Sequence, residues 1–293
     1  MKRTRGYVVV DVFTTRPLLG NPVAVVLDGE GLDTAAMQAI ARWTNLSETT
    51  FVLPPTTSDA DYRLRIFTPR SELPFAGHPT LGSAHAILES GRIKPRRGDH
   101  FIQQCEIGLV EVSIGEKEGV RQMTLGLPPS RLDSLNPADV AELEAIFECS
   151  GRIVTAPAVV NVGAIWTVLH LCDAATVLGL RPDLARLADF ERRLGITGVT
   201  AFGVHESGDA AIEVRTFAPS CGVDEDPVCG SGNGSAAVFQ WGRGLLPPGG
   251  RDYVASQGRC VGRDGRVHVS VDASGQVRVG GACVTCVAGT LAV

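Results

Sequence analysis

The sequence predicts an α+β fold made of two similar lobes that are related by internal duplication. Glycine (34 residues) and proline (17 residues) are frequent while aromatic residues make up only 5% of the 293 residues, a composition that favours many short strands and turns. Similar residues recur at an offset of 150 positions, as between residues 37 and 187. Each copy also contains a glycine-rich turn before a helix. Together these observations predict two copies of one sheet-rich unit.

The repeat keeps one register for more than thirty residues. Matched pairs include Leu46 with Ile196, Thr50 with Thr200, Arg65 with Arg215, Phe67 with Phe217 and, after a three-residue insertion in the second copy, Pro74 with Pro227 and Gly77 with Gly230. The register crosses a helix and two strands without a break, and the glycine-rich turn follows after the insertion. Conservative pairings can arise by chance in apolar sequence, but a register kept across several elements favours a duplication, which we therefore predict.

Local patterns define the elements of the first copy. Residues 33–42 have apolar positions at helical spacing after Asp33, which can cap the helix. Residues 48–53 and 62–67 alternate and are rich in β-branched side chains, which predicts two strands. A helix is predicted over 79–90, with a proline in its first turn and a glycine directly after it.

The second copy is predicted to have its matching helix over residues 232–241, rich in small side chains that allow close packing. Between the copies, residues 127–135 read LPPSRLDSL. Proline and serine are typical of connecting segments. We therefore expect the chain to cross from one lobe to the other there.

Charge and hydropathy exclude several classes of protein. The chain has 27 Lys and Arg against 32 Asp and Glu, a net charge of −5, so no basic excess predicts a nucleic-acid partner. No run approaches about 20 apolar residues, and the N-terminal apolar run is broken at Asp11, so we expect neither a membrane partner nor an export signal. The eight scattered cysteines are then expected to be reduced in the cytoplasm. Cys283 and Cys286 form a lone CxxC whose side chains would point to opposite faces of a strand, so no metal site is expected.

The two glycine-rich turns are the candidate binding elements. The first glycine turn reads FAGHPTLG (75–82) and the second reads EDPVCGSGNG (225–234). A helix N-terminus offers free N–H groups and partial positive charge to an anion, most simply a carboxylate. The alternative is structural, since glycine also serves positive φ angles and close packing. The matched pair favours a site for a small acid in a cleft between the lobes.

Positions at which the copies differ are the candidate catalytic residues. Glu48 aligns with Gly198, and a carboxylate there could move a proton from carbon if burial raises its pKa toward neutrality. The alternative is an exposed glutamate on a strand. His78 aligns with Ser231 and is either a second acid or base, a hydrogen-bond partner of a substrate oxygen, or a histidine bound to the backbone.

Two residues of the second turn have similar alternatives. Asp226 is either an acceptor for a substrate amine or part of the turn itself. Cys229 aligns with Ala76, so the pair of turns offers a single thiol. A thiol at a helix start is expected to have a lowered pKa.

Four runs carry a resemblance to a known family: VFTTRPLLGNPVAVV, NLSETTFVLPP, FTPRSELPFAGHPTLGSAHA and FAPSCGVDEDPVCGSGNG. They resemble the PhzF phenazine-biosynthesis family, relatives of the diaminopimelate epimerases, over nearly the whole chain. The resemblance implies two lobes, each a mostly antiparallel sheet wrapped around a central helix, with the active site in the cleft between them. The lobes would span residues 1–128 and 129–281, and the terminal strand, about 282–293, would return to the first lobe. It also implies an isomerase that needs neither PLP, nor metal, nor any other cofactor, and a homodimer.

The resemblance also implies roles for individual residues. Glu48, in the NLSE motif, inherits the glutamate that moves a proton between carbons of trans-2,3-dihydro-3-hydroxyanthranilate in phenazine-forming members. His78 and Asp226 match the other catalytic positions. The expected substrate-binding residues are Asn21, Gly77, Cys229, Gly230 and Ser231.

One departure from the family pattern keeps other functions open. The second motif commonly reads DPVTGSA, whereas here it reads DPVCGSG, with Cys229 where two-thiol epimerases carry one of their bases. Ala76 removes the second thiol, which disfavours a two-cysteine racemase. An amino-acid or hydroxy-acid epimerase that uses Glu48 and Cys229 is one alternative, and a non-catalytic small-acid binding protein is another. Dinucleotide binding at GSGNG is disfavoured because the full fingerprint is absent.

Overall fold

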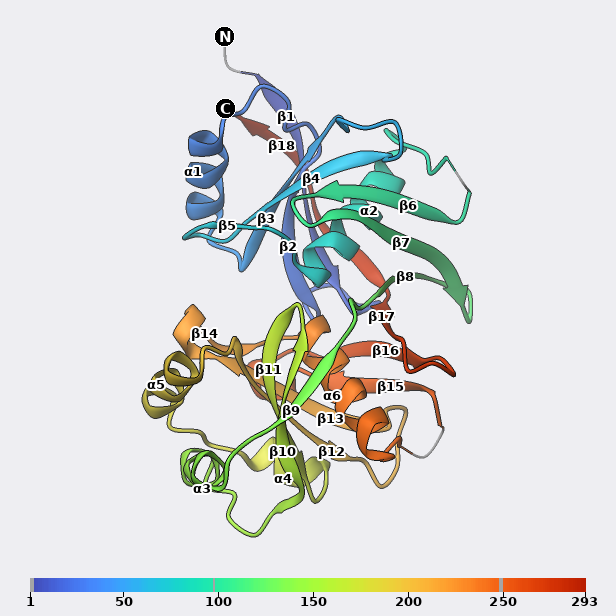
Figure 1. The fold of residues 1–293 in the computed structure, drawn as a ribbon. Helices are drawn as coiled ribbons and strands as arrows, with labels where there is room; N and C mark the ends of the chain where they lie inside the picture. The colour runs from blue at the N-terminus through green and yellow to red at the C-terminus, as the bar shows by residue number, and fades with distance from the viewer. Residues whose placement is uncertain (1–2, 97, 248–249) are drawn as a thin grey trace. The chain divides into compact units, whose positions relative to one another are not determined.

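The computed structural model describes residues 3–96, 98–247 and 250–293 of the chain. It divides into two compact units: unit 1 comprises Met1–Leu125 and Gly280–Val293, and unit 2 comprises Gly126–Val279. Figure 1 labels their elements. None of the helices in the described ranges is long and apolar enough to cross a membrane.

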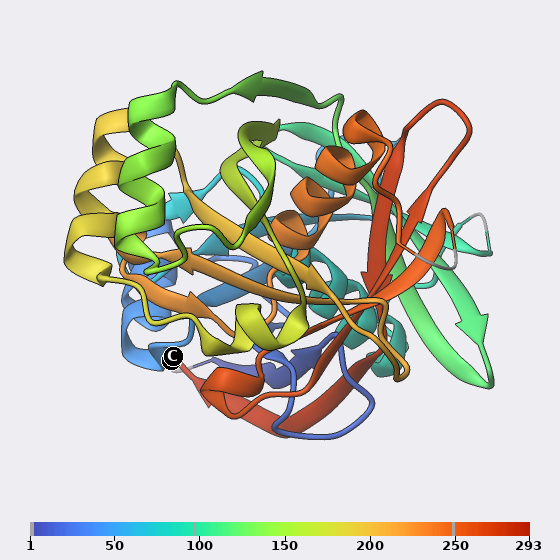
Figure 2. The same cartoon turned by 90° about the horizontal axis from the view of Figure 1, so that it is seen from below.

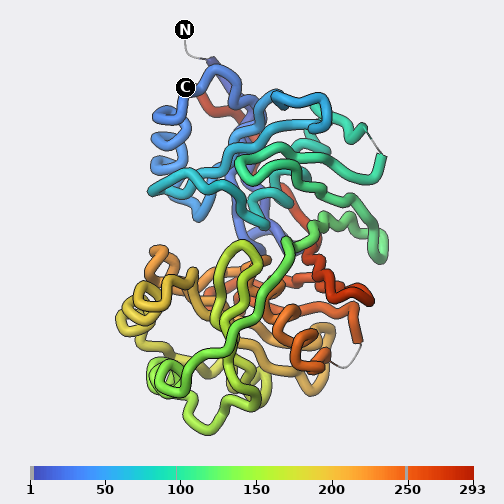
Figure 3. Tube along the Cα trace, in the orientation of Figure 1, coloured from blue at the N-terminus to red at the C-terminus, as the bar shows by residue number. Residues whose placement is uncertain are grey.

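Unit 1 is a mixed, mostly antiparallel sheet with two helices. Its elements are β1 (Thr4–Val12), β2 (Asn21–Val26), α1 (Thr34–Thr44), β3 (Glu48–Leu53), β4 (Tyr62–Phe67), β5 (Glu72–Leu73), α2 (Gly77–Ser90), β6 (His100–Cys105), β7 (Gly108–Lys117), β8 (Val120–Gly126, whose last residue falls in unit 2) and β18 (Cys283–Ala292). Strand β1 pairs with both β18 and β2, and β2–β3 and β4–β6 are parallel pairs. The start of β1 and the end of β18 lie side by side (Figure 3), where the Arg3 N–H donates to the Val293 carbonyl at 2.9 Å.

Helix α2 forms the core of unit 1. Ten consecutive residues, from His78 to Ile87, are buried, and the helix contacts β1, β2, β3, β7 and β18. A Cβ atom at Gly82 would lie 2.4 Å from Val23 Cγ1, so glycine is required for the close approach of helix and strand. A helix that is buried all round needs partners on every side, and here the strands supply them.

Unit 2 contains the same kinds of element. They are β9 (Arg131–Ser134), α3 (Pro137–Ile146), β10 (Ile153–Val162), β11 (Ala164–Leu171), α4 (Ala174–Gly179), α5 (Leu184–Leu194), β12 (Gly198–Val204), β13 (Ile212–Ala218), η1 (Pro219–Cys221), β14 (Val223–Asp226), α6 (Gly230–Arg243), β15 (Asp252–Gln257), η2 (Arg259–Val261), β16 (Gly265–Val271) and β17 (Val277–Gly281, which ends in unit 1). Its parallel pairs are β11–β12 and β13–β15. Helix α6 is buried and contacts β9, β10, β11, β12 and β16. Helices α3 and α5 lie side by side (Figure 2).

Strand registers reproduce the offset seen in the sequence. In unit 1, Thr49 of β3 pairs with Phe67 of β4; in unit 2, Val199 of β12 pairs with Phe217 of β13. Both members shift by the same number, since 199 − 49 and 217 − 67 are both 150. The parallel pairs β2–β3 and β4–β6 of unit 1 likewise correspond in order to β11–β12 and β13–β15 of unit 2, while α3 and α4 of unit 2 have no counterpart among the described elements of unit 1.

An arginine fork ties the strand before each glycine turn to its neighbour. Arg65 donates two hydrogen bonds to Glu72, each at 2.6 Å, and Arg215 donates two to Glu225, at 3.0 and 2.7 Å. Each guanidinium also lies over the phenylalanine two residues further along its strand, 5.1 and 4.9 Å from the ring centroid. The chain therefore enters both turns from a fixed strand.

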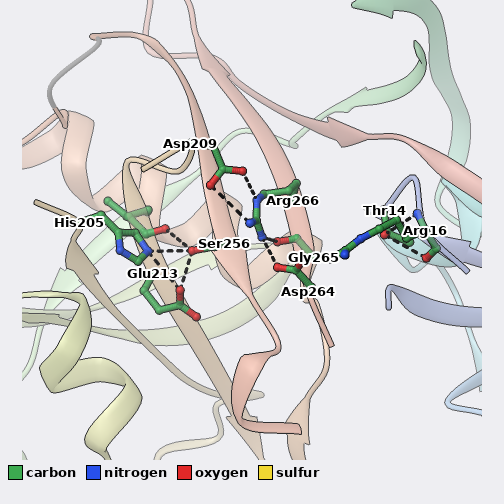
Figure 4. A network of polar contacts seen from close by, with 10 residues as sticks. Thr14, Arg16, His205, Asp209, Glu213, Ser256, Asp264, Gly265 and Arg266 are labelled. Atoms are coloured by element: carbon green, nitrogen blue, oxygen red, sulfur yellow. Dashed lines mark hydrogen bonds and ion pairs between the residues drawn. The ribbon is translucent and has the colours of Figure 1, made fainter. Parts of the chain in front are cut away.

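A separate polar cluster joins three strands of unit 2 (Figure 4). The Ser256 hydroxyl donates to Glu213 Oε2 at 2.6 Å and lies 2.9 Å from His205 Nε2. Burial raises the pKa of Glu213. Because Ser256 and Glu213 are almost fully buried, the cluster links β13 and β15 to the end of β12 rather than forming an open site.

Most of the predicted elements are confirmed, with shifted ends. Strands 48–53 and 62–67 have the predicted limits, and Asp33 caps α1 by accepting from the Ala36 N–H. The helices predicted over 79–90 and 232–241 begin two residues earlier, at Gly77 and Gly230. The segment 127–135 is not only a connection, because its residues 131–134 form β9, which gains ladder hydrogen bonds to β10.

Candidate active site

Three predicted residues of unit 1 meet where β2, β3 and α2 begin. Asn21 is the first residue of β2, Glu48 is the first residue of β3, and His78 is the second residue of α2. His78 Nε2 lies 3.2 Å from Glu48 Oε2, and both atoms are buried. On its other side, His78 Nδ1 lies 3.4 Å from the Asn21 side-chain nitrogen. An amide nitrogen only donates, so this contact favours the tautomer with its proton on Nε2, facing the carboxylate.

The environment of Glu48 suits a proton-transfer group. Its side chain is 15% exposed, which contradicts the alternative of an exposed glutamate on a strand. Burial raises the pKa of Glu48 from 4.5 to about 7, while a hydrogen bond with the Ser47 side chain lowers it to a smaller extent. A base with a pKa near the working pH can both accept and return a proton.

The start of α2 is open. Ala76 occupies the N-cap position and provides no side-chain hydrogen bond. A Cβ atom at Gly77 would meet no heavy atom of the described chain within 4 Å, and Gly77 does not have a positive φ. Neither packing nor backbone conformation within the described chain therefore requires glycine there. The N–H groups at this helix start are those of Gly77 and His78, since Pro79 has none, and a helix N-terminus favours an anion.

The second glycine turn is closed by its own hydrogen bonds. Asp226 ends β14, and its Oδ1 atom accepts from the Val228 N–H at 3.0 Å. The buried Gln257 side chain accepts from the Cys229 N–H at 3.1 Å and donates to the Asp226 carbonyl at 2.9 Å. It also accepts from Asn233 at 2.7 Å. These bonds hold the turn in one conformation.

Cys229 is the N-cap of α6, and its chemistry differs from the expectation. The thiol sulfur accepts from the Gly232 N–H at 3.3 Å and lies 3.5 Å from Ser231 Oγ. Burial, together with the nearby Asp226 carboxylate, raises the pKa of Cys229 well above its usual value. The prediction of a lowered pKa is wrong, because desolvation and a like charge outweigh the helix N-terminus.

Ser231 is held by a residue that the sequence motifs did not indicate. Trp166 of β11 donates its indole N–H to Ser231 Oγ at 3.1 Å. Trp166 pairs with Gly198 across the parallel β11–β12 ladder. The sequence held one indirect signal for Trp166. Glu48 aligns with Gly198, and a glycine in a strand leaves space for a large side chain on the neighbouring strand.

The predicted residues thus form two groups. Unit 1 brings Asn21, Glu48, Gly77 and His78 together, and unit 2 brings Asp226, Cys229, Gly230 and Ser231 together at the start of α6. Within residues 3–96, 98–247 and 250–293, no group of three or more His, Cys, Asp or Glu side chains is arranged to hold a metal ion.

The fold is that of PhzF proteins and related epimerases. A PhzF-family protein from Bacillus anthracis superposes with a TM-score of 0.85 at 21% identity, covering 99% of this chain and 100% of that one. A predicted epimerase from Pseudomonas aeruginosa gives a TM-score of 0.79 at 30% identity, covering 98% and 99%.

Sequence comparison agrees with the fold. The model of the PhzC-PhzF family, described as phenazine biosynthesis-like protein, matches residues 10–289, so the chain belongs to this family. It is 41% identical over 288 residues to "Antisense-enhancing sequence 1" of Schizosaccharomyces pombe, covering 96% of both chains. It is 34% identical over 272 residues to trans-2,3-dihydro-3-hydroxyanthranilate isomerase of Pseudomonas aeruginosa, covering 92% of this chain and 91% of that one.

Proposed function

We propose that the protein is a cofactor-independent isomerase that moves a proton between carbons of a small carboxylated substrate, similar to trans-2,3-dihydro-3-hydroxyanthranilate. The observation that carries this proposal is the contact of Glu48 with His78 at the start of α2, where burial raises the pKa of Glu48 to about 7. Membership of a family that includes a named isomerase at 34% identity supports the same reaction class.

The proposed reaction uses one carboxylate twice. Ionised Glu48 takes a proton from a substrate C–H bond, and the electrons of that bond form the new double bond. The former double bond then takes the proton from Glu48 at its other carbon, so no electrons leave the substrate and the base is regenerated. His78 faces the carboxylate with its Nε2 atom and stabilises the charged form or a substrate oxygen.

The remaining residues are assigned to binding. Asn21 orients the His78 ring, and the open start of α2 at Gly77 provides N–H groups for a substrate oxygen. Gly230 and Ser231 at the start of α6 are the proposed contacts of the substrate carboxylate. That both turns face one substrate in a cleft stays a prediction, as does a cytoplasmic homodimer. The shared register offset of β3–β4 and β12–β13 supports the proposal of an internal duplication.

The alternatives predict different roles for Cys229. An epimerase that uses Glu48 and Cys229 needs a thiol that ionises readily, whereas burial and Asp226 raise the pKa of this thiol, and the sulfur already caps α6. A non-catalytic binding protein has no need for a buried glutamate whose pKa lies near neutrality.

Solvent deuterium incorporation tests the proposal. Small carboxylated candidates, beginning with trans-2,3-dihydro-3-hydroxyanthranilate, are incubated in D2O with wild type, Glu48→Gln and Cys229→Ser. We expect Glu48→Gln to lower the exchange rate by about 10²–10⁴-fold, since the base is removed, and Cys229→Ser to retain most of it. Loss of exchange in Cys229→Ser with retention in Glu48→Gln would favour the epimerase, and no exchange with any candidate acid would contradict the isomerase.

A further inference from the structure

We propose that Trp166 is a positioning residue that turns the Ser231 hydroxyl into a hydrogen-bond donor for the carboxylate of the substrate, an inference that rests on the proposed function. The indole N–H donates to Ser231 Oγ at 3.1 Å, and Trp166 is only 4% exposed. The tryptophan therefore does not touch the substrate and acts through the serine.

The single hydrogen of the Ser231 hydroxyl determines which of its contacts it can donate to. Ser231 Oγ carries one hydrogen and can accept on its lone pairs. Because the Trp166 N–H only donates, Ser231 is the acceptor in that contact, and its own hydrogen is left for another partner. The neighbouring acceptor is Cys229 Sγ at 3.5 Å, a weak acceptor that already receives the Gly232 N–H. A carboxylate oxygen forms a stronger, charge-assisted hydrogen bond and replaces it.

Gly198 creates the space for the indole ring. A Cβ atom at Gly198 would lie 2.7 Å from Trp166 Cζ3 and 2.1 Å from the Phe217 carbonyl oxygen. The indole thus packs directly against the backbone of β12, where any larger residue would displace it.

The parallel strand pair of unit 1 that corresponds to β11–β12 carries different side chains. There the parallel register pairs Val23 with Glu48, while in unit 2 it pairs Trp166 with Gly198. A small residue faces the glutamate in one unit, and a large residue faces the glycine in the other. Unit 2 therefore has an indole donor bound to Ser231 in place of the carboxylate that contacts His78, and this donor does not titrate in the range where proteins fold.

A titration of the protein with carboxylates tests directly whether Trp166 acts through Ser231 on a bound carboxylate. The protein is labelled with 15N-tryptophan, and the indole resonance of Trp166 is identified by its absence in Trp166→Phe. Benzoate and 3-hydroxyanthranilate, an aromatic analogue without a proton to move, are added as probes. We expect a saturable shift of this resonance, and no shift of that of Trp43, whose side chain lies 76% exposed on α1.

A double-mutant cycle tests the dependence on Ser231. Loss of one neutral hydrogen bond predicts an increase of about 5-fold in the dissociation constant of the bound probe for Trp166→Phe, measured by calorimetry. In the Ser231→Ala background, Trp166→Phe should add no further loss. The matched control Trp43→Phe should bind like wild type. In turnover, the proposal predicts a KM increase of about 5-fold for Trp166→Phe with kcat within about twofold of wild type.

Three outcomes would overturn the inference: no carboxylate shifts the Trp166 resonance, Trp166→Phe binds like wild type, or its effect is additive with that of Ser231→Ala. If Trp166→Phe does not fold, the Trp166 resonance is identified as the one that Ser231→Ala moves, and the titration of wild type still decides. Failure of the isomerase itself is distinguishable, because it appears as the absence of deuterium exchange while the carboxylate titration is unaffected.

Discussion

The two glycine turns occupy equivalent places in two similar units and differ in chemistry. At the start of α2, Ala76 gives no cap and Glu48 contacts His78, so the groups there can exchange a proton. At the start of α6, Cys229 caps the helix and Trp166 binds Ser231, so the groups there hold a fixed hydrogen-bond pattern. One framework thus presents different side chains at equivalent positions, both in the turns and on the strands beside them.

We expect the largest difference between the units when the arginine of each fork is replaced, measured as the loss in free energy of unfolding. The side chains of Arg215 and Glu225 are 6% and 10% exposed, against 17% and 30% for Arg65 and Glu72. Arg215 also donates to the carbonyls at the end of α4, at 3.2 and 2.8 Å. We expect Arg215→Met to lower the free energy of unfolding by about 3–5 kcal/mol, since it leaves a buried carboxylate without its partner.

Arg65→Met is the matched control for this prediction. Its ion pair is closer to water, so we expect a loss of about 1 kcal/mol. Both variants are compared with wild type by urea denaturation. Equal losses would show that burial does not distinguish the two forks.

Glu48 makes the stability of unit 1 depend on pH, whereas Gly198 at the equivalent place in unit 2 cannot. Because the pKa of folded Glu48 is about 7 against 4.5 for the unperturbed group, the folded protein binds this proton more tightly than the unfolded chain. The stabilisation is full below about pH 4.5 and is lost as the pH rises through about 7, which amounts to about 3 kcal/mol.

The measurement compares wild type with Glu48→Gln, which has no charge to bury. We expect the difference in free energy of unfolding to shift by about 2.5 kcal/mol in favour of the variant between pH 5 and pH 8, measured by urea denaturation. A constant difference across this range would mean that Glu48 ionises with an ordinary pKa. In turnover, the rate should rise with an apparent pKa near 7 as Glu48 becomes ionised.

Gly198 and Gly77 differ in whether the surrounding chain leaves room for a Cβ atom. Gly198→Ala places a Cβ atom against Trp166 and the β13 backbone, and we expect a loss of about 1–3 kcal/mol of stability. Gly77→Ala places a Cβ atom where the described chain has no heavy atom within 4 Å, so stability should change by less than about 0.5 kcal/mol. Thermal denaturation checks both, and a large loss for Gly77→Ala would contradict an open helix start.

The predictions made from sequence succeeded where the signal is local. Strands β3 and β4 have the predicted limits because their alternation lies within six residues each. The starts of α2 and α6 were placed two residues late, because glycine is a weak helix former and gives no start signal of its own. Trp166 and Gln257 were missed because their partners at the second turn lie 65 and 28 residues away.

The amino-acid sequence alone determined the family and the identity of the residues at each turn, since these depend on residue types and their spacing. Only the tertiary structure decided their ionisation. Glu48 is moved toward neutrality and Cys229 is kept protonated by burial. Burial is the sum of contacts from strands and helices far apart in the chain, and desolvation acts through that sum, so no short motif can encode it.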